Sequence, residues 1–162
     1  MTETRQAVHS GGCQCGAVRY ALFAEPTNPH ICHCRMCQKA FGGFFAPLAK
    51  IQNRDLAWTR GVPATFLSSP IVERGFCAAC GTPLTFRFIE TDGTDISLGS
   101  LDDPAAVQPA RQYGTEGRLP WFAELHKMPG ATTDSSMPAD RLERIVSHQH
   151  PDHDTDSWPS TG

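Results

Sequence analysis

Hydrophobic and polar residues alternate over short stretches of this chain, and Gly, Pro and Asp residues separate the stretches. This pattern predicts strands at 17–23, 44–51, 55–59, 64–68, 83–88 and 95–98. Residues 91–94 would turn the fifth strand into the sixth and form a hairpin. Helical signal is confined to 34–41 and to a short helix at Pro104, capped by Asp102 or Asp103. The pattern predicts a mainly β fold, a small antiparallel β-sheet domain with few short helices.

The length of 162 residues favours one domain, and no fixed-period repeat divides the chain. We expect an N-terminal tail at 1–9, a folded domain at 10–130 and a partly mobile C-terminal extension at 131–162, because the chain becomes polar after Pro129. The extension carries His148, His150 and His153 among aspartates, which could bind a metal adventitiously. A solvated tail is the favoured interpretation.

The charge pattern argues against two classes of partner. The formal net charge is −3 and there is no run of Lys or Arg, so we expect no nucleic acid partner. No apolar run approaches the roughly 20 residues that a membrane span needs. The first residues also lack the basic start and apolar stretch of a signal peptide, so we expect a cytoplasmic protein.

All seven cysteines fall into three short clusters, at 13–15, 32–37 and 77–80. An odd count in a reducing compartment disfavours disulfides. Thiols one or two residues apart can bind the same ion, and zinc is favoured over an iron–sulfur cluster as the metal. We therefore predict two zinc ions per chain. One would be a closed structural site of Cys13, Cys15, Cys77 and Cys80, and the other an open, catalytic-type site of Cys32, Cys34 and Cys37.

The three-cysteine site suits thiol chemistry. Zinc with three thiolates is a weak Lewis acid, but it keeps an incoming thiol deprotonated at neutral pH. Arg35 and Lys39 flank the cluster and could bind a substrate carboxylate or balance the charge of the site; ordinary solvated side chains are the equal alternative. A structural site completed by His33, His30 or a side chain from elsewhere in the chain is the alternative for the cluster as a whole.

Four segments of the chain, 12–20, 32–38, 76–84 and 99–104, together resemble the glutathione-dependent formaldehyde-activating enzyme family, which includes the centromere protein V type. The resemblance covers about residues 10 to 130. It implies a fold of the Mss4-like type around a structural zinc and the division of cysteines given above, with Cys32, Cys34 and Cys37 as the catalytic set. It also implies a carbon–sulfur lyase-type activity, the condensation of glutathione with formaldehyde to S-(hydroxymethyl)glutathione.

The resemblance breaks at one position that bears on substrate. Family members often carry a His where this chain has Tyr113, whereas the later Trp121 is kept. The thiol or the aldehyde of this protein can therefore differ from glutathione or formaldehyde. Trp121 could line a substrate pocket beside the metal or belong to the core. A non-catalytic zinc-binding module is the alternative function, and exposed strand edges make a homodimer conceivable.

Overall fold

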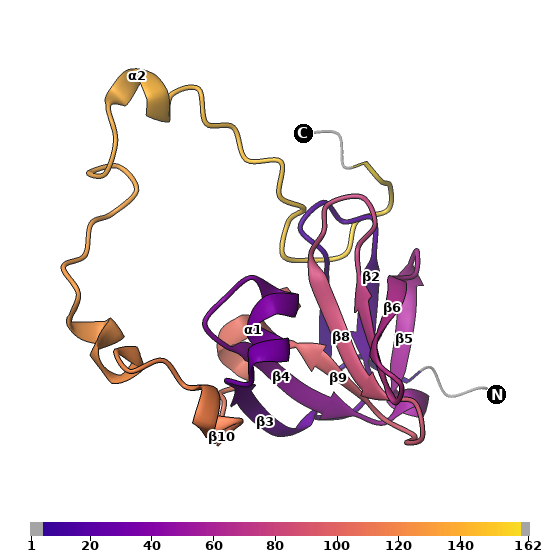
Figure 1. Ribbon diagram of the computed structural model, residues 1–162. Helices are drawn as coiled ribbons and strands as arrows, with labels where there is room; N and C mark the ends of the chain where they lie inside the picture. The colour runs from indigo at the N-terminus through magenta and orange to yellow at the C-terminus, as the bar shows by residue number, and fades with distance from the viewer. Residues whose placement is uncertain (1–4, 160–162) are drawn as a thin grey trace.

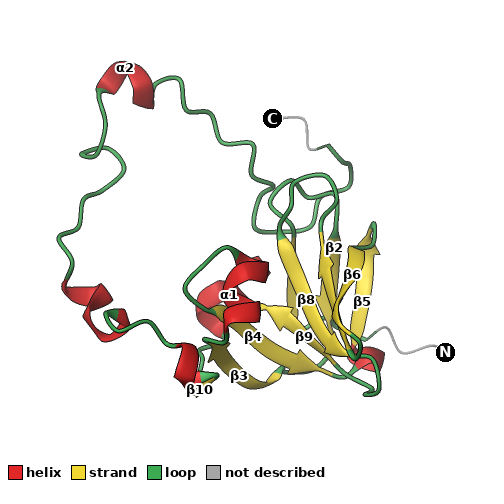
Figure 2. Cartoon of the chain, viewed as in Figure 1, coloured by secondary structure: helices red, strands yellow, loops and turns green. Residues whose placement is uncertain are grey.

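The computed structural model describes residues 5–159, which form two β-sheets with short helical segments between and after the strands (Figures 1 and 2). Across these residues the strands are β1 (His9–Gly12), β2 (Arg19–Leu22), β3 (Thr27–Cys32), β4 (Ala46–Ile51), β5 (Leu56–Arg60), β6 (Ala64–Ser69), β7 (Val72–Phe76), β8 (Pro83–Phe88), β9 (Thr94–Ser97) and β10 (Arg111–Tyr113). The α-helices are α1 (Arg35–Phe41) and α2 (Ala139–Leu142), and 3-10 turns lie at Asn53–Asp55, Leu98–Ser100, Pro104–Ala106, Thr115–Gly117 and Phe122–Lys127.

The strands form a three-stranded sheet in the order β1-β2-β5 and a seven-stranded sheet in the order β10-β3-β4-β9-β8-β7-β6. Neighbouring strands pair antiparallel except β10, which pairs parallel with β3 and places Tyr113 opposite Cys32. The predicted mainly β class is confirmed, and so is the hairpin of β8 and β9, in which Thr85 pairs with Ile96.

The two sheets share one hydrophobic core. Tyr20 and Leu22 of β2 are fully buried against Leu84 of β8 and Ile96 of β9. Each such buried side chain contributes about 1.5–3 kcal/mol to the free energy of folding. Cys13 and Cys77 belong to the same cluster, so the first and third cysteine clusters begin inside this core.

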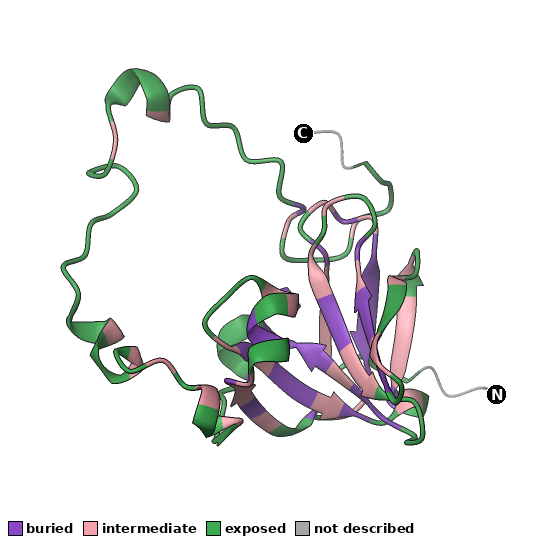
Figure 3. Cartoon of the chain, viewed as in Figure 1, coloured by how far each residue is buried: buried purple, intermediate pink, exposed green. Residues whose placement is uncertain are grey.

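After β10 the chain leaves the sheets. Figure 1 shows this segment swinging outward to α2 and returning to the loops at the ends of β2 and β8. The outer part of this path is exposed, and burial resumes at the point of return (Figure 3). Among the described residues, no helix is both long and apolar enough to cross a membrane. The division at residues 10 and 130 stays a prediction.

Candidate metal centres

The seven cysteine sulfur atoms gather into two groups, and each group could hold a metal ion. The first group is made of Cys13, Cys15, Cys77 and Cys80, and the second of Cys32, Cys34 and Cys37. Within each group the sulfur atoms all lie within 4.8 Å of one another, and all seven cysteines are free thiols. The structure thus has the grouping that the spacing indicated; the role of these residues as zinc ligands stays a prediction.

The first group joins the two sheets. Cys13 and Cys15 lie in the turn between β1 and β2, and Cys77 and Cys80 lie in the turn between β7 and β8. The turns are tight because Gly16 and Gly81 adopt positive φ angles of 78° and 80°, which favour glycine.

The geometry of the first group fits zinc. The Sγ atoms of Cys13 and Cys15 are 3.6 Å apart, and those of Cys15 and Cys77 are 3.9 Å apart. Four sulfur atoms arranged tetrahedrally at a zinc–sulfur distance of about 2.3 Å would be about 3.8 Å apart. The two measured separations lie on either side of that value.

Neutral hydrogen-bond donors surround the first group. The Val18 backbone N–H donates to Cys13 Sγ at 3.3 Å, and the Thr82 hydroxyl lies 3.1 Å from Cys80 Sγ. Burial raises the pKa of Cys13 and of Cys77. Burial also acts to raise the pKa of Cys80, but hydrogen bonds with Thr82 outweigh it and lower that pKa to about 6. The low pKa means that this thiol loses its proton readily when a metal ion binds.

The C-terminal strap, residues 149–158, returns to the turn of the first group. The backbone N–H of His150 donates to the Gln14 carbonyl at 2.7 Å, and the Trp158 indole N–H donates to the Cys15 carbonyl at 2.6 Å. His150 is only 4 % exposed, and a Cβ on Gly16 would lie 2.2 Å from its ring. The expectation of a fully solvated His-rich tail is therefore wrong for His150, because the strap packs onto this turn.

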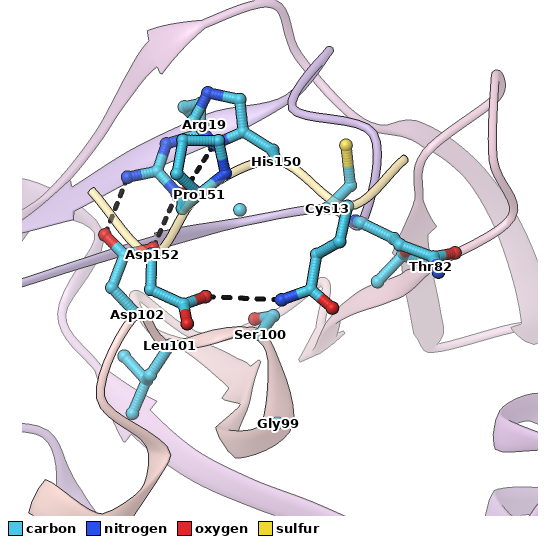
Figure 4. Close-up of a pocket in the computed structure, with 13 residues that line it drawn as sticks. Cys13, Arg19, Thr82, Gly99, Ser100, Leu101, Asp102, His150, Pro151 and Asp152 are labelled. Atoms are coloured by element: carbon cyan, nitrogen blue, oxygen red, sulfur yellow. Dashed lines mark hydrogen bonds and ion pairs between the residues drawn. The ribbon is translucent and has the colours of Figure 1, made fainter. Parts of the chain in front are cut away.

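An ion-pair network holds the strap to the sheets. The buried Arg19 donates to both carboxylate oxygens of Asp102 at 2.6 Å and to Asp154 of the strap at 2.9 Å. Burial acts to raise the pKa of Asp102, but Arg19 outweighs it and the pKa is lowered. In Figure 4, Pro151 and Asp152 of the strap and the ion-paired Arg19 and Asp102 line the same cavity, which has a volume of about 140 Å³.

This network also separates the two predicted cap residues. Asp103 caps the 3-10 turn by accepting a hydrogen bond from the Ala105 backbone N–H at 3.1 Å. Asp102 instead faces Arg19 and accepts a further hydrogen bond from Ser10 at 2.5 Å. Of the two residues named as possible caps, Asp103 is therefore the cap.

The second group comes from one continuous stretch of chain. Cys32 ends β3, Cys34 precedes α1, and Cys37 lies in the first turn of α1. The backbone N–H of Cys37 donates to Cys34 Sγ at 3.4 Å, so the helix start itself orients this thiol. The sequence predicted two helical turns over 34–41, and α1 covers Arg35–Phe41. It ends at Gly42, whose φ of 60° stops the helix.

Neither nearby histidine joins the second group. His33 is fully buried, with its Nε2 2.9 Å from Gln112 Oε1 and its ring 4.7 Å from the Phe122 ring. His30 uses its Nδ1 to contact the Asn28 carbonyl at 2.8 Å. Among the described residues, the second group therefore contains three potential ligands. Neither His30 nor His33 completes it in the structure.

Arg74 is the residue of this site that sequence reasoning missed. It lies on β7, is 3 % exposed, and donates from Nη2 to Cys37 Sγ at 3.4 Å. Hydrogen bonding to Cys32 and then to Arg74 lowers the pKa of Cys37 to about 5, against the effect of burial. The sequence predicted no strand at 72–76, so it offered no face on which to place Arg74; in the structure the side chain shares the buried face of β7 with Val72.

A hollow of about 520 Å³ lies beside the second group. It is lined by Arg35, Met36, Lys39, Ala40, Phe66, Ser68 and Arg74. The structure therefore brings Arg35 and Lys39 together with Arg74. It places Trp121 elsewhere, where it packs edge-on against Phe44 at 4.7 Å and does not line this hollow.

Tyr113, the residue at the family's His position, also lies outside the hollow. Its ring packs against His30 at 4.9 Å, and its hydroxyl donates to Asn28 Oδ1 at 3.1 Å. Its carbonyl accepts from the His33 backbone N–H at 2.8 Å. This backbone contact ties β10 to the loop between Cys32 and Cys34.

Comparisons with known proteins bear on the family and on the fold. Residues 8–116 match the sequence model of a family described as glutathione-dependent formaldehyde-activating enzyme, which confirms the resemblance drawn from the four segments. The chain is 29 % identical over 80 residues to a Schizosaccharomyces pombe protein named as an uncharacterized lyase. The matched region covers 49 % of this chain and 58 % of that protein. The chain thus spans little more than half of that relative.

A solved Rhodobacter sphaeroides structure shares the fold. The match has a TM-score of 0.52 at 20 % identity and covers 64 % of this chain and 98 % of that one. A likeness at this identity bears on fold alone.

Proposed function

Because the chain belongs to the glutathione-dependent formaldehyde-activating enzyme family, we propose that it is a carbon–sulfur lyase-type enzyme that forms or cleaves a thiol–aldehyde adduct. The thiol is glutathione or a related molecule, and the aldehyde is formaldehyde or another small aldehyde. The observation that carries the proposal is the second cysteine group, in which three sulfur atoms from one stretch of chain lie beside a hollow.

The proposal assigns different roles to the two cysteine groups. The first group would hold a structural zinc between the sheets, and the second would hold the catalytic zinc. A zinc ion held by Cys32, Cys34 and Cys37 would keep the substrate thiol in its thiolate form near neutral pH. A cytoplasmic location, where cysteines stay reduced, belongs to the same proposal.

The protein's own residues orient the second group and shape the approach to it. Arg74 donates to Cys37 Sγ and places a positive charge beside the thiolates. Met36, Ala40 and Phe66 give the hollow an apolar wall that reduces the space for water around a bound thiol. Holding thiol and aldehyde together converts a bimolecular step into an effectively unimolecular one.

The test is the rate of adduct formation above the spontaneous rate. Exchange between free formaldehyde and its glutathione adduct is measured by NMR, with and without protein. We expect the wild type to accelerate exchange, and Cys34→Ser to lose the acceleration while it keeps the fold. Exchange at the spontaneous rate with every thiol and aldehyde tried would support the alternative of a non-catalytic zinc-binding module.

A further inference from the structure

β6 is an edge strand of the seven-stranded sheet, and it exposes large apolar side chains. Within residues 5–159 this strand pairs only with β7, so no strand lies along its other side. Phe66 and Leu67 of β6 are 47 % and 62 % exposed. An edge strand of this kind presents unpaired backbone N–H and C=O groups together with hydrophobic surface, and it is therefore a template for pairing with another strand.

Further exposed apolar side chains surround β6. Val62 precedes the strand, and Ile71 lies in the turn to β7. The Ile71 carbonyl accepts a hydrogen bond from the backbone N–H of Ile89 at 3.0 Å, and Phe88 pairs with Val72 directly after that turn. Val62, Ile71, Phe88 and Ile89 are all exposed. Apolar surface that is gathered in one place, rather than scattered singly, marks an interaction site.

The stretch that contains β6 and its two flanking turns carries no charge. Residues 61–72 include no Asp, Glu, Lys or Arg. Exposed edge strands are commonly protected from self-association by a lysine or another charged residue, and this strand lacks that protection. A two-fold interface brings the same surface of both copies together, so a charged strand would repel its own copy. The uncharged edge is self-complementary, which favours a second copy of this chain over a charged partner.

The other three sheet edges differ from β6. On the outer side of β1, Gly11 forms a bridge with Leu101. β5 ends at Arg60, which donates a hydrogen bond to the strap. β10 is three residues long and begins with Arg111. Among the described edge strands, β6 alone combines an uncharged sequence with two large exposed apolar side chains.

The backbone of β6 is regular over the part that would pair. Its register against β7 runs without interruption from Ala64 to Leu67, and the register shift lies between Leu67 and Ser69, beside the turn. Pro63 precedes the strand, and every residue from 64 to 69 keeps its backbone N–H. A bulge or a proline within the edge would hinder pairing, and neither interrupts 64–67.

From these observations we propose that β6 is a dimerisation edge, along which two copies of this chain pair their β6 strands antiparallel about a two-fold axis. The seven-stranded sheet then continues into that of the second copy, and the exposed apolar side chains of both copies pack beside the new strand pair. Phe66 also lines the hollow beside the second cysteine group, so the second copy lies next to that hollow. The inference does not depend on the proposed function, because it involves no thiol, aldehyde or metal.

The test is the oligomeric state of the full-length protein in solution. Sedimentation velocity over a range of protein concentrations measures the dissociation constant, and we expect a monomer–dimer equilibrium without larger species, since a two-fold contact closes on itself. Hydrogen exchange at a dimeric and at a monomeric concentration locates the contact. We expect the outward-facing backbone amides of 64–67 to exchange about 10-fold more slowly in the dimer, and those of β10 to exchange equally in both states.

Two matched variants test whether the contact is at β6. Leu67→Lys adds a charge to the paired strand of each copy, at a side chain whose exposure makes it dispensable for the monomer. Val146→Lys adds the same charge at a residue that is 73 % exposed in the outer part of the chain after β10. We expect Leu67→Lys to weaken dimerisation at least about 10-fold and Val146→Lys to change it by less than about 2-fold. Circular dichroism and zinc content show that both variants fold as the wild type does.

A wild type that stays monomeric at every concentration overturns the inference. A dimer that survives Leu67→Lys also overturns it, because the contact would then lie elsewhere. The same holds for a dimer that Val146→Lys weakens equally, since net charge alone would then explain the loss. Slower exchange at another strand and not at 64–67 would place the contact outside β6. None of these results bears on the lyase proposal, which the rate of adduct exchange tests separately.

Discussion

The two cysteine groups use the same side chain in opposite structural settings. The first group takes its sulfur atoms from two turns that belong to different sheets, and the C-terminal strap packs against one of those turns. The second group takes its three sulfur atoms from one stretch between β3 and α1, beside a hollow. A cluster that joins distant segments stabilises the fold, whereas a local cluster leaves the fold intact when its metal changes.

The two cysteine groups also differ in the charge of the hydrogen-bond donors that contact them. Neutral donors such as Thr82 and the Val18 N–H contact the first group, while the cationic Arg74 contacts the second. A neutral shell suits a permanent site. A buried guanidinium beside a thiol stabilises its thiolate form and offsets the negative charge of the second group. The comparison predicts that equivalent substitutions in the two groups have different consequences.

The largest expected difference is between Cys77→Ser and Cys34→Ser. Loss of a structural zinc can cost on the order of 10 kcal/mol of folding free energy, so Cys77→Ser should unfold or be isolated only as a destabilised form. Cys34→Ser should lose no more than about 2 kcal/mol of stability, since its group joins no distant strands. Urea unfolding followed by circular dichroism measures both. Equal losses in the two variants would remove the structural distinction between the groups.

The next prediction concerns the ion pair that anchors the strap on the side of the first group. Asp102→Asn leaves Arg19 without its main counter-charge, which should cost about 3–5 kcal/mol of unfolding free energy at pH 7. Burial raises and Arg19 lowers the pKa of Asp102, with a net decrease. Its stabilisation is therefore present above its unfolded pKa of about 4 and is lost as the pH falls below that value.

The measurement for Asp102 is the difference in unfolding free energy between the wild type and Asp102→Asn as a function of pH. We expect this difference to be constant from about pH 5 to 8 and to shrink below about pH 4. Asp103→Asn is the matched control, because Asn is also a good cap residue and should change stability by only a few tenths of a kcal/mol. A difference that grows in acid would mean that Asp102 is not the charged partner of Arg19.

A smaller effect is expected at Arg74, which should act on the second group alone. Arg74→Met keeps much of the buried volume but removes the donor to Cys37 Sγ. Removing such a supporting contact typically costs about 10–100-fold in metal affinity. Zinc competition with a chromophoric chelator measures the affinity of both groups in one titration. Arg87→Met, on the neighbouring strand, is the control and should leave both affinities unchanged.

The sequence predicts some parts of the fold and of the cysteine groups better than others, because only some of them produce a local pattern along the chain. Spacing predicted the grouping of cysteines, because short pairs can share an ion only when their turns meet. Alternation predicted β4, β5, β6 and β8, whose apolar positions repeat. It missed β1, whose HSGG sequence contains two glycines, and β3, which contains Asn28 and Pro29. It also missed β7 and the short β10. Those strands form through pairing with neighbours, a tertiary effect that local propensity does not contain.

Single contacts between distant residues left even less signal. Arg74 was missed because Glu73, Arg74 and Gly75 interrupt the apolar pattern, so that no strand was predicted at 72–76. For Trp121 the sequence left a substrate pocket and the core as equal alternatives; in the structure it is 44 % exposed and packs edge-on against Phe44. His150 lies in a polar, His- and Asp-rich stretch with no hydrophobic pattern, and its burial depends on the turn at Gly16.

The smallest effect that should still differ between the two cysteine groups is expected from the loss of a strap contact. Trp158→Ala removes the indole N–H that donates to the Cys15 carbonyl, a loss of about 0.5–1.5 kcal/mol for one hydrogen bond. The contact is to the turn that carries two thiols of the first group, so its loss should speed zinc release from that group about 2- to 10-fold. Release from the second group should not change, because the strap does not line its hollow.

Trp121→Ala is the matched control for the strap, since Trp121 and Trp158 are both 44 % exposed and differ in what they contact. Zinc release to a chelator is followed in the wild type and both variants, with Cys34→Ser as background to assign the phase of the first group. Acceleration by Trp158→Ala alone would assign the strap to the first group. If Trp121→Ala accelerates the same phase equally, the loss of any exposed aromatic suffices, and the strap contributes nothing specific to that group.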